Sequence, residues 1–130
     1  MKGIRIFLGF SALVWLPYGI FCFFQPTALG SYTGLVAQTA TASTEVRAMY
    51  GGLEAAIGTF ALAALLRPTL IRPVLLMLAF LGTGLALGRL GGMLTDGGVS
   101  AYTVSGLVFE IASAGFAMWL LPNAPTTSSI

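Results

Sequence analysis

The stretch PVLLMLAFLGTGLALGRLGGM, residues 73–93, decides the fold because it contains a single charged side chain, Arg89. About 20 predominantly apolar residues are enough for a helix to cross the roughly 30 Å hydrocarbon core of a bilayer. The stretch therefore predicts a transmembrane helix that begins between residues 70 and 73 and ends near Met93.

Three further stretches show the same apolar character. They predict helices over residues 3–24, 45–66 and 101–121. Ser43 or Thr44 is expected to cap the second helix and Ser100 the fourth, because hydroxyl groups accept hydrogen bonds from the first turn. The predicted fold is all-α. It is a four-helix transmembrane bundle of two antiparallel helical hairpins, forming one domain over residues 1–122 with a polar tail at 123–130.

Composition supports a membrane protein and excludes several other classes. Hydrophobic residues make up 57% of the chain and charged residues only 8%, whereas soluble domains carry about 25% charged residues. The net charge of +2 is small and its charges are scattered, so no nucleic-acid partner is expected. Histidine is absent and Cys22 is the single cysteine, which argues against a disulfide, a cysteine-based zinc site or a histidine-ligated cofactor. No cofactor is predicted.

Basic residues near the predicted helix ends set the expected orientation. Lys2, Arg5, Arg67 and Arg72 fall on one side of a membrane that the chain crosses an even number of times. Glu45, Arg47 and Asp96 fall on the other side. Because cytoplasmic ends carry an excess of Lys and Arg, both termini are expected in the cytoplasm, with the protein in a bacterial inner membrane.

Three charged residues lie well inside the predicted spans, away from the helix ends. They are Glu54, Arg89 and Glu110, and Arg47 lies near one helix end. A charge inside a bilayer costs several kcal/mol on most scales, so such residues are candidates for a functional site. At 1.5 Å per residue, Glu54 and Glu110 both lie about 13 Å from the outer ends of their helices, and Arg89 about 6 Å.

These depths, together with the small residues on the same helical faces, predict that Glu54, Arg89 and Glu110 converge. Tyr18, Tyr50 and Arg47 are expected towards the outer mouth of the same site. One hypothesis is a structural ion-pair network that fixes the helix register. The other is an outer-leaflet pocket for a small polar, anionic or lipid-like ligand. The long connection at residues 25–44 is expected to fold back over the bundle as a lid.

Gly84, Gly88 and Gly92 form a small-residue ridge on the third predicted helix. Such ridges let membrane helices approach closely. Tight packing within the monomer is the favoured interpretation, and homodimerisation is the alternative. Glu54 and Glu110 alone do not indicate a metal site, because the Glu-x-x-His motifs of di-iron bundles are missing.

Two segments resemble a family of small bacterial membrane proteins catalogued as domain of unknown function 4345. They are SALVWLPYG at residues 11–19 and TEVRAMYGG at residues 44–52, with LGRL at 87–90 and Phe109-Glu110 in support. The resemblance covers about residues 3–121 and implies four transmembrane helices, with looser kinship to DoxX-like proteins. It implies that Glu45, Arg47, Tyr50, Arg89 and Glu110 belong to the family pattern. Glu54 is a candidate only because of its position in the predicted span. The resemblance implies no activity.

Three function hypotheses follow. The first is binding or movement of a small polar or lipid-like ligand by Arg47, Tyr50, Glu54, Arg89, Glu110 and Tyr18. The second is an accessory subunit of a larger membrane complex, or a homo-oligomer, with the buried charges as structural ion pairs. The third is an intramembrane enzyme using Glu54 or Glu110 as acid or base. No nucleophile supports it, and no catalytic residue is assigned.

Overall fold

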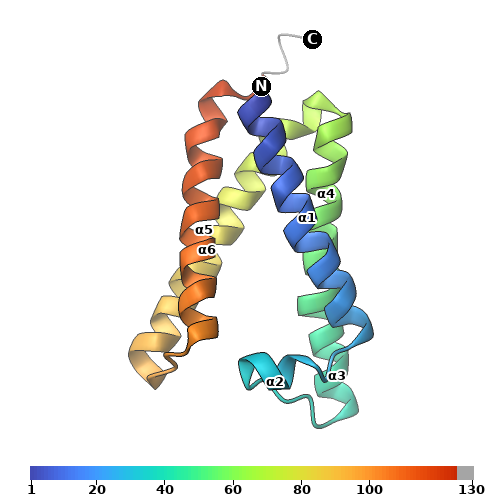
Figure 1. Cartoon of the computed structure of the whole chain (residues 1–130), viewed down its shortest axis with the longest axis vertical. Helices are drawn as coiled ribbons and strands as arrows, with labels where there is room; N and C mark the ends of the chain where they lie inside the picture. The colour runs from blue at the N-terminus through green and yellow to red at the C-terminus, as the bar shows by residue number, and fades with distance from the viewer. Residues whose placement is uncertain (126–130) are drawn as a thin grey trace. The chain divides into compact units, whose positions relative to one another are not determined.

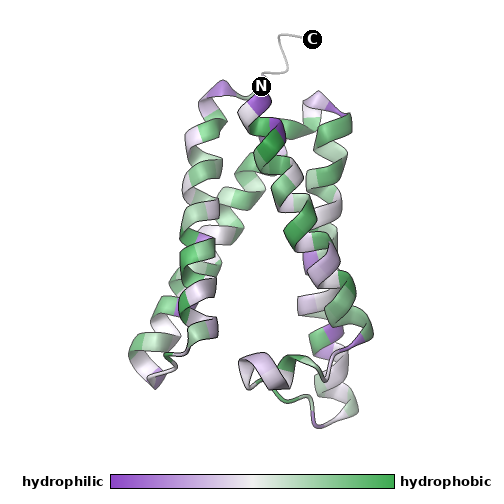
Figure 2. Cartoon of the chain, in the orientation of Figure 1, coloured by the Kyte–Doolittle hydropathy of each residue, from purple (hydrophilic) through white to green (hydrophobic). Residues whose placement is uncertain are grey.

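The computed structural model describes residues 1–125, and this part of the chain is helical with no β-strand (Figure 1). Four segments are long and apolar enough to cross a membrane. They are Lys2–Phe24, Ala40–Leu66, Pro68–Asp96 and Ala101–Asn123. Apolar residues dominate the length of these helices (Figure 2). The predicted all-α, four-helix transmembrane fold is confirmed, and the chain is a multi-pass membrane protein.

The chain divides into two compact units. The N-terminal unit is formed by Ile4–Arg67 with Lys2, and the C-terminal unit begins at Pro68. That residues 1–122 form one domain stays a prediction. Of the predicted tail at 123–130, Ala124 is buried, and residues 126–130 lie outside the described part of the chain.

In the N-terminal unit, α1 (Lys2–Phe24) runs antiparallel to a continuous helical segment. That segment consists of α3 (Ala40–Val46), the π-helix η1 (Arg47–Gly52) and α4 (Leu53–Leu66). The two backbones touch where glycines face the partner helix. A Cβ atom on Gly58 would lie 2.3 Å from the backbone nitrogen of Leu16, and one on Gly19 would lie 2.3 Å from that of Ala55. Any larger side chain at these two positions would separate the helices.

The second long helix begins earlier than predicted. Its N-cap is Thr39, whose hydroxyl accepts a hydrogen bond from the Ala42 amide at 3.1 Å, so the predicted cap at Ser43 or Thr44 is wrong. Thr44 lies inside the helix and donates its hydroxyl to the Ala40 carbonyl at 2.9 Å. Threonine serves as a cap or bonds back to the preceding turn, and this run of hydroxyl residues offers several equivalent starting points.

The connection between α1 and α3 contains a short helix, α2 (Leu29–Thr33), which ends at Gly34 in a left-handed conformation with φ of 76°. Leu29 is buried in a cluster with Cys22 and Val46, against which Tyr18, Ala37 and Tyr50 also pack. The connection therefore folds back onto the N-terminal unit itself, because Leu29 supplies an apolar anchor within an otherwise small and polar stretch.

The C-terminal unit is a hairpin of α5 (Ile71–Asp96) and α6 (Ala101–Leu120), flanked by the short 3-10 helices η2 (Pro68–Leu70) and η3 (Leu121–Asn123). α5 continues past the predicted end at residue 93 and stops at Gly97, whose φ of 68° is left-handed. The predicted Ser100 cap of α6 is confirmed, and Thr103 completes a reciprocal capping box.

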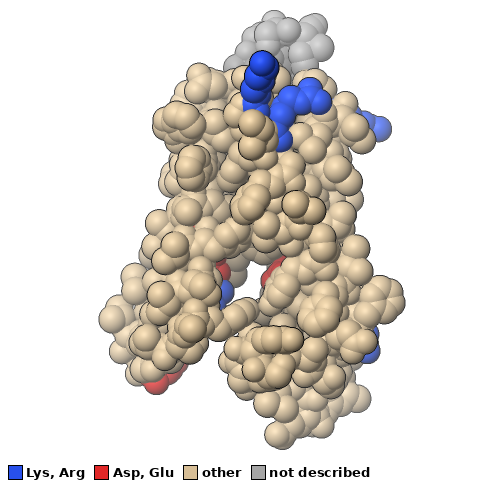
Figure 3. All heavy atoms as spheres, in the orientation of Figure 1, with Lys and Arg blue, Asp and Glu red and all other residues tan. Residues whose placement is uncertain are grey.

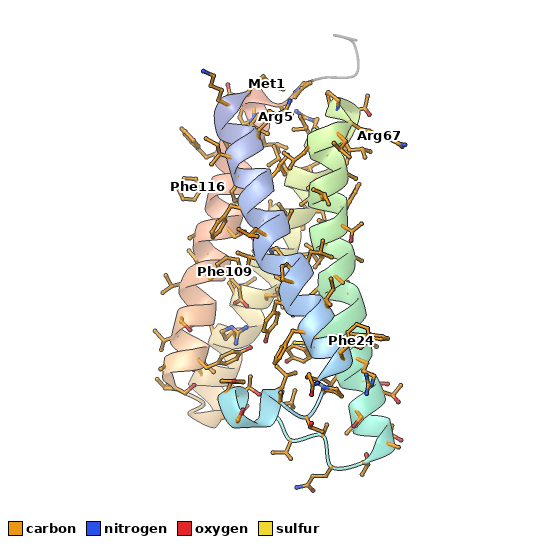
Figure 4. All side chains as sticks on the ribbon, turned by 45° about the vertical axis from the view of Figure 1, so that its right-hand side comes forward. Met1, Arg5, Phe24, Arg67, Phe109 and Phe116 are labelled. Atoms are coloured by element: carbon orange, nitrogen blue, oxygen red, sulfur yellow. The ribbon has the colours of Figure 1, made fainter. Side chains whose placement is uncertain are left out.

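Basic side chains gather at one end of the N-terminal unit, and Arg72 lies near the start of α5. Figure 3 shows Lys and Arg at the end that carries the N-terminus, and Figure 4 shows Arg5 and Arg67 at the same end of the N-terminal unit. Arg5 Nη2 donates to the Leu65 carbonyl at 3.4 Å, and Arg72 Nη1 to the Leu121 carbonyl at 3.4 Å. Each arginine thus lies against carbonyls at the end of a neighbouring helix, where positive charge is favoured.

Candidate functional site

The central feature of the C-terminal unit is an ion pair between Arg89 on α5 and Glu110 on α6. Arg89 Nη2 donates to Glu110 Oε1 at 2.6 Å. Arg89 Nε donates to Oε2 at 3.0 Å and to Oε1 at 3.2 Å. Both carboxylate oxygens therefore accept from one edge of the guanidinium, which is the strong, bidentate form of this pair.

Two glycines allow the pair to form between α5 and α6. A Cβ atom on Gly82 of α5 would lie 3.1 Å from the Glu110 carbonyl and 3.2 Å from Ala114 Cβ. On α6, a Cβ atom on Gly106 would lie 2.9 Å from Arg89 Cζ and 3.0 Å from its Nε. Gly82 thus brings the backbones together, and Gly106 leaves the space that the guanidinium occupies.

An aromatic residue lies beside Arg89. Its Cζ lies 5.7 Å from the centroid of the Tyr102 ring, within the range of a cation–π interaction. Tyr102, Gly106 and Glu110 follow one another at intervals of a helical turn and share one face of α6. Arg89 therefore lies along this face, with the carboxylate at one end and the phenol ring at the other.

The two charges differ in exposure. The Glu110 side chain is only 4% exposed, whereas the Arg89 side chain is 23% exposed. The carboxylate is thus buried, and the arginine side chain keeps part of its surface open. A molecule approaching the pair meets the cationic partner first.

In the N-terminal unit, Arg47 has a local structural role. Its Nη1 donates a hydrogen bond to the Phe23 carbonyl, and its Cζ lies 5.7 Å from the Phe23 ring centroid. Phe23 lies in the last turn of α1, whose final carbonyls have no intrahelical partner. Arg47 therefore caps the C-terminus of α1, where a cation interacts favourably with the helix dipole.

Arg47 is also the first residue of the π-helix η1. A π-helix contains a wider turn than an α-helix, and such turns are frequent at functional sites. Across this turn Arg47 reaches Phe23, and Gly51 lies so close to α1 that a Cβ atom would be 2.9 Å from Phe23 Cα. The segment RAMYGG thus connects the interior of the second long helix to the C-terminal end of α1.

A family model described as a domain of unknown function (DUF4345) matches residues 3–121. The chain belongs to the DUF4345 family. Comparison with curated proteins and with solved structures found no match. The match spans all four transmembrane segments, so both the Arg89–Glu110 pair and the π-helix lie inside the region that the DUF4345 model describes.

The structure brings some of the predicted site residues of this DUF4345 protein together within each unit. Arg89 and Glu110 are paired in the C-terminal unit. In the N-terminal unit, Tyr18 and Tyr50 pack against the Cys22 cluster. Arg47 meets Phe23, and Glu54 lies in the first turn of α4, directly after the π-helix. Convergence of Glu54 with the Arg89–Glu110 pair would join the two units, and it stays a prediction.

Sequence reasoning missed Tyr102 and the π-helix. The spacing of Tyr102, Gly106 and Glu110 was a usable signal, because residues four and eight positions apart share a helical face. No residue pattern in Arg47–Gly52 distinguishes a π-turn from an α-turn. Within residues 1–125, no group of three or more His, Cys, Asp or Glu side chains is arranged to hold a metal ion.

The glycine ridge does not contribute to the α5–α6 contact of the C-terminal unit. A Cβ atom on Gly84 or Gly88 would meet no atom within 4 Å, and one on Gly92 would meet only Asp96 Oδ2, at 3.9 Å. The prediction that this ridge packs tightly is therefore wrong for the α5–α6 hairpin. Gly82, two residues before the ridge, makes the close approach on the opposite face of α5.

Proposed function

We propose that the protein binds or moves a small polar or lipid-like ligand in the outer leaflet of a bacterial inner membrane. Arg89 is the principal contact. The observation that carries this proposal is the unequal exposure of the pair, with Arg89 23% and Glu110 4% exposed. An arginine inside a membrane span is costly unless its charge is compensated or used. Glu110 supplies the compensation, and the exposed part of Arg89 supplies a hydrogen-bond donor surface.

The proposed orientation places both termini in the cytoplasm. Arg5 and Arg67 mark one end of the N-terminal unit, and Arg72 marks the corresponding end of the hairpin. Trp119, 68% exposed near the same end of α6, suits a membrane interface. Arg89 lies about 26 Å along α5 from Arg72, at 1.5 Å per residue. The ion pair therefore belongs to the outer half of the bilayer.

Arg47 and the two tyrosines contribute a second polar region at the outer end of the N-terminal unit. Arg47 and Tyr50 come from the π-helix, and Tyr18 comes from α1. Tyr18, Tyr50, Arg47 and Glu54 are the candidate ligand-binding residues of the N-terminal unit. Arg47 acts there mainly by fixing the end of α1 through the Phe23 carbonyl.

A second candidate function is supported by the geometry of the pair. Both oxygens of Glu110 accept hydrogen bonds from Arg89, so the two charges compensate each other without a ligand. Large apolar side chains such as Leu13, Phe80 and Leu94 are more than two-thirds exposed. In this alternative those faces pack against other subunits of a membrane complex or another copy of the chain, and the ion pair only fixes the hairpin.

Native mass spectrometry of protein released from membranes without harsh detergent distinguishes the two. Ligand binding predicts a defined small-molecule adduct on the wild-type chain that is lost in Arg89→Ala. Arg72→Ala is the matched control, because it removes an arginine from the opposite end of the same helix, and it should keep the adduct. A bare chain, or a stoichiometric complex with other subunits and no adduct, would refute ligand binding and support the accessory role.

A further inference from the structure

The connection at residues 25–44 combines exposed apolar side chains with a lack of charge. It contains no Asp, Glu, Lys or Arg. Tyr32 is 68% exposed, Val36 60% and Leu35 41%. Exposed apolar side chains that lie close together are typical of a surface that contacts a partner or a membrane. The connection is therefore a candidate contact surface, and its depth relative to the bilayer indicates what it contacts.

The packing of α2 against the long helices of its unit sets that depth. Leu29, the first residue of α2, is buried with Cys22 of α1 and Val46 of α3. Cys22 comes 20 residues after Lys2, at the basic end of α1. Val46 comes 20 residues before Leu66, at the basic end of α4. Each interval corresponds to about 30 Å at 1.5 Å per residue.

The hydrocarbon core of a bilayer is also about 30 Å thick. Basic residues at the ends of membrane helices mark one of its boundaries. Both long helices of the N-terminal unit therefore place the Leu29 anchor at the opposite boundary, where hydrocarbon meets the lipid head groups. At this depth α2 lies beside the membrane surface rather than well above it in water.

Several polar groups around α2 have hydrogen-bond partners within the connection itself. The Ser31 hydroxyl donates to the Ala28 carbonyl at 2.7 Å, and the Thr33 hydroxyl donates to the Leu29 carbonyl at 2.8 Å. The Leu35 amide donates to Thr33 Oγ1 at 2.9 Å. Polar groups that are bonded within the protein cost less to bring near hydrocarbon than groups that depend on water. The segment is thus suited to the edge of a bilayer.

We infer that the segment at residues 29–36 lies in the interfacial layer of the bilayer, at the face opposite the basic helix ends. It contacts lipid through Tyr32, Leu35 and Val36. Tyrosine is enriched at the level of the head groups, and the two aliphatic side chains reach the adjoining acyl chains. Phe24, in the last turn of α1, is 68% exposed, so the lipid-facing surface of α1 extends to the start of the connection. This contact is independent of the ligand-binding function proposed above.

The absence of charge specifies the kind of lipid surface that is needed. Each Lys or Arg near a membrane adds about 1 kcal/mol of attraction to anionic lipids. Because residues 25–44 contain neither, the contact should form on zwitterionic phosphatidylcholine and should not require phosphatidylglycerol. A protein surface over the segment would instead shield the same side chains from lipid.

The test measures how often a nitroxide on the full-length protein collides with oxygen, which is concentrated in lipid, and with a water-soluble nickel complex. The protein is placed in phosphatidylcholine nanodiscs in a Cys22→Ala background. The nitroxide is attached to Tyr32→Cys or Val36→Cys. At both positions the ratio of oxygen to nickel collisions should be several times the ratio at the control Thr41→Cys, and it should approach the ratio at Leu13→Cys.

The two reference positions represent water and lipid. Thr41 is exposed on α3 and lies about 7 Å further from the basic helix end than Val46, at 1.5 Å per residue. Leu13 is 72% exposed near the middle of α1. All four labelled positions are exposed, so the nitroxide does not displace buried side chains.

Three results would overturn the inference. A ratio at Tyr32 and Val36 equal to that at Thr41 would place the segment in water. Few collisions with either reagent would show that a protein surface covers it. A high ratio that appears only with phosphatidylglycerol would contradict an uncharged contact. Because Cys22→Ala can fail to fold, the wild-type protein provides a second measurement. Its Tyr32 and Val36 amide NMR signals should be broadened by a nitroxide lipid and not by a water-soluble gadolinium complex, and the reverse pattern would also overturn the inference.

Discussion

Arg89 of α5 holds both carboxylate oxygens of Glu110 on α6, with Nη2 to Oε1 at 2.6 Å and Nε to Oε2 at 3.0 Å. Gly106 makes this geometry accessible, because any side chain there would occupy the position of the guanidinium. The pair is thus built from three positions on two neighbouring helices. Its consequences for stability and for binding can be separated by substitution.

The first prediction concerns the energy of the pair. Arg89→Met should lower the free energy of unfolding by about 3–5 kcal/mol, because it leaves Glu110 buried without its partner. The double substitution Arg89→Met with Glu110→Leu removes both charges and should cost less than Arg89→Met alone. Steric trapping in bicelles measures these free energies. Additive effects of the two substitutions would contradict a direct pair.

The second prediction concerns Gly106. Gly106→Ala places a Cβ atom 2.9 Å from Arg89 Cζ, so the guanidinium must shift and its geometry with Glu110 should be disturbed. We expect a loss of about 1–3 kcal/mol, as for overpacked interiors. Gly84→Ala is the control. It meets no neighbour and should be neutral, or stabilising by up to about 1 kcal/mol from helix propensity. Thermal unfolding of both variants in one detergent compares them, and equal melting temperatures would refute the crowding argument.

Much of the fold follows from the sequence because a bilayer imposes a length. Twenty apolar residues interrupted by Arg67-Pro68 or Gly97-Gly98 leave few alternatives to a spanning helix. Ser100 was identifiable as a cap because no other hydroxyl residue precedes α6 at that point. The start of α3 was not, because Thr39, Thr41, Ser43 and Thr44 are equivalent as isolated residues. Which of these residues becomes the N-cap depends on the path of the chain between α2 and α3.

The candidate site was only partly predictable for a related reason. Charge and depth suggested that Arg89 and Glu110 meet, since opposite charges inside a membrane attract strongly. The cap that Arg47 makes on α1 was not predictable. It depends on the π-turn of η1, which no residue pattern in Arg47–Gly52 indicates. A contact between Glu54 and the Arg89–Glu110 pair would depend on how the two units are arranged. No local sequence pattern specifies that arrangement.

The third prediction concerns the connection that contains α2. Cys22 is 0% exposed beneath Leu29 and Val46, so the wild-type protein should resist labelling by a small maleimide. Leu29→Ser removes the apolar anchor of α2 and should make Cys22 reactive by at least about tenfold. Tyr32→Ser, at an exposed position on the same short helix, is the control and should stay protected. Equal labelling of all three proteins would show that α2 does not cover Cys22.

The fourth prediction concerns the π-helix. Met49 lies within η1 and is 55% exposed, so its deletion removes a residue with few contacts and should convert the segment to an α-helix. The residues before the deletion would then rotate by about 100° relative to α4. Arg47 would lose the Phe23 carbonyl, and Cys22 labelling should rise. Met49→Ala, which keeps the residue count, should leave Cys22 protected. A protected Cys22 after deletion would contradict this role of the wide turn.

The fifth prediction concerns orientation. In a Cys22→Ser background, Gly98→Cys in the α5–α6 turn should react with a membrane-impermeant maleimide added to intact spheroplasts. Thr69→Cys, in the exposed turn before α5, should react only after lysis. This result is expected because basic residues flank Thr69 and remain on the cytoplasmic side. The reverse labelling pattern would place the Arg89–Glu110 pair in the inner leaflet.

The most direct measurement is a ¹⁵N–¹H spectrum of the arginine side chains in lipid nanodiscs, with the Nε–H signal of Arg89 assigned by its loss in Arg89→Lys. We predict a signal shifted by its carboxylate partner, which shifts again when a lipid extract of the native membrane is added. The Arg72 signal should not move. An Arg89 signal that resembles an exposed arginine, or one that does not respond to the lipid, would contradict a paired arginine that contacts a ligand.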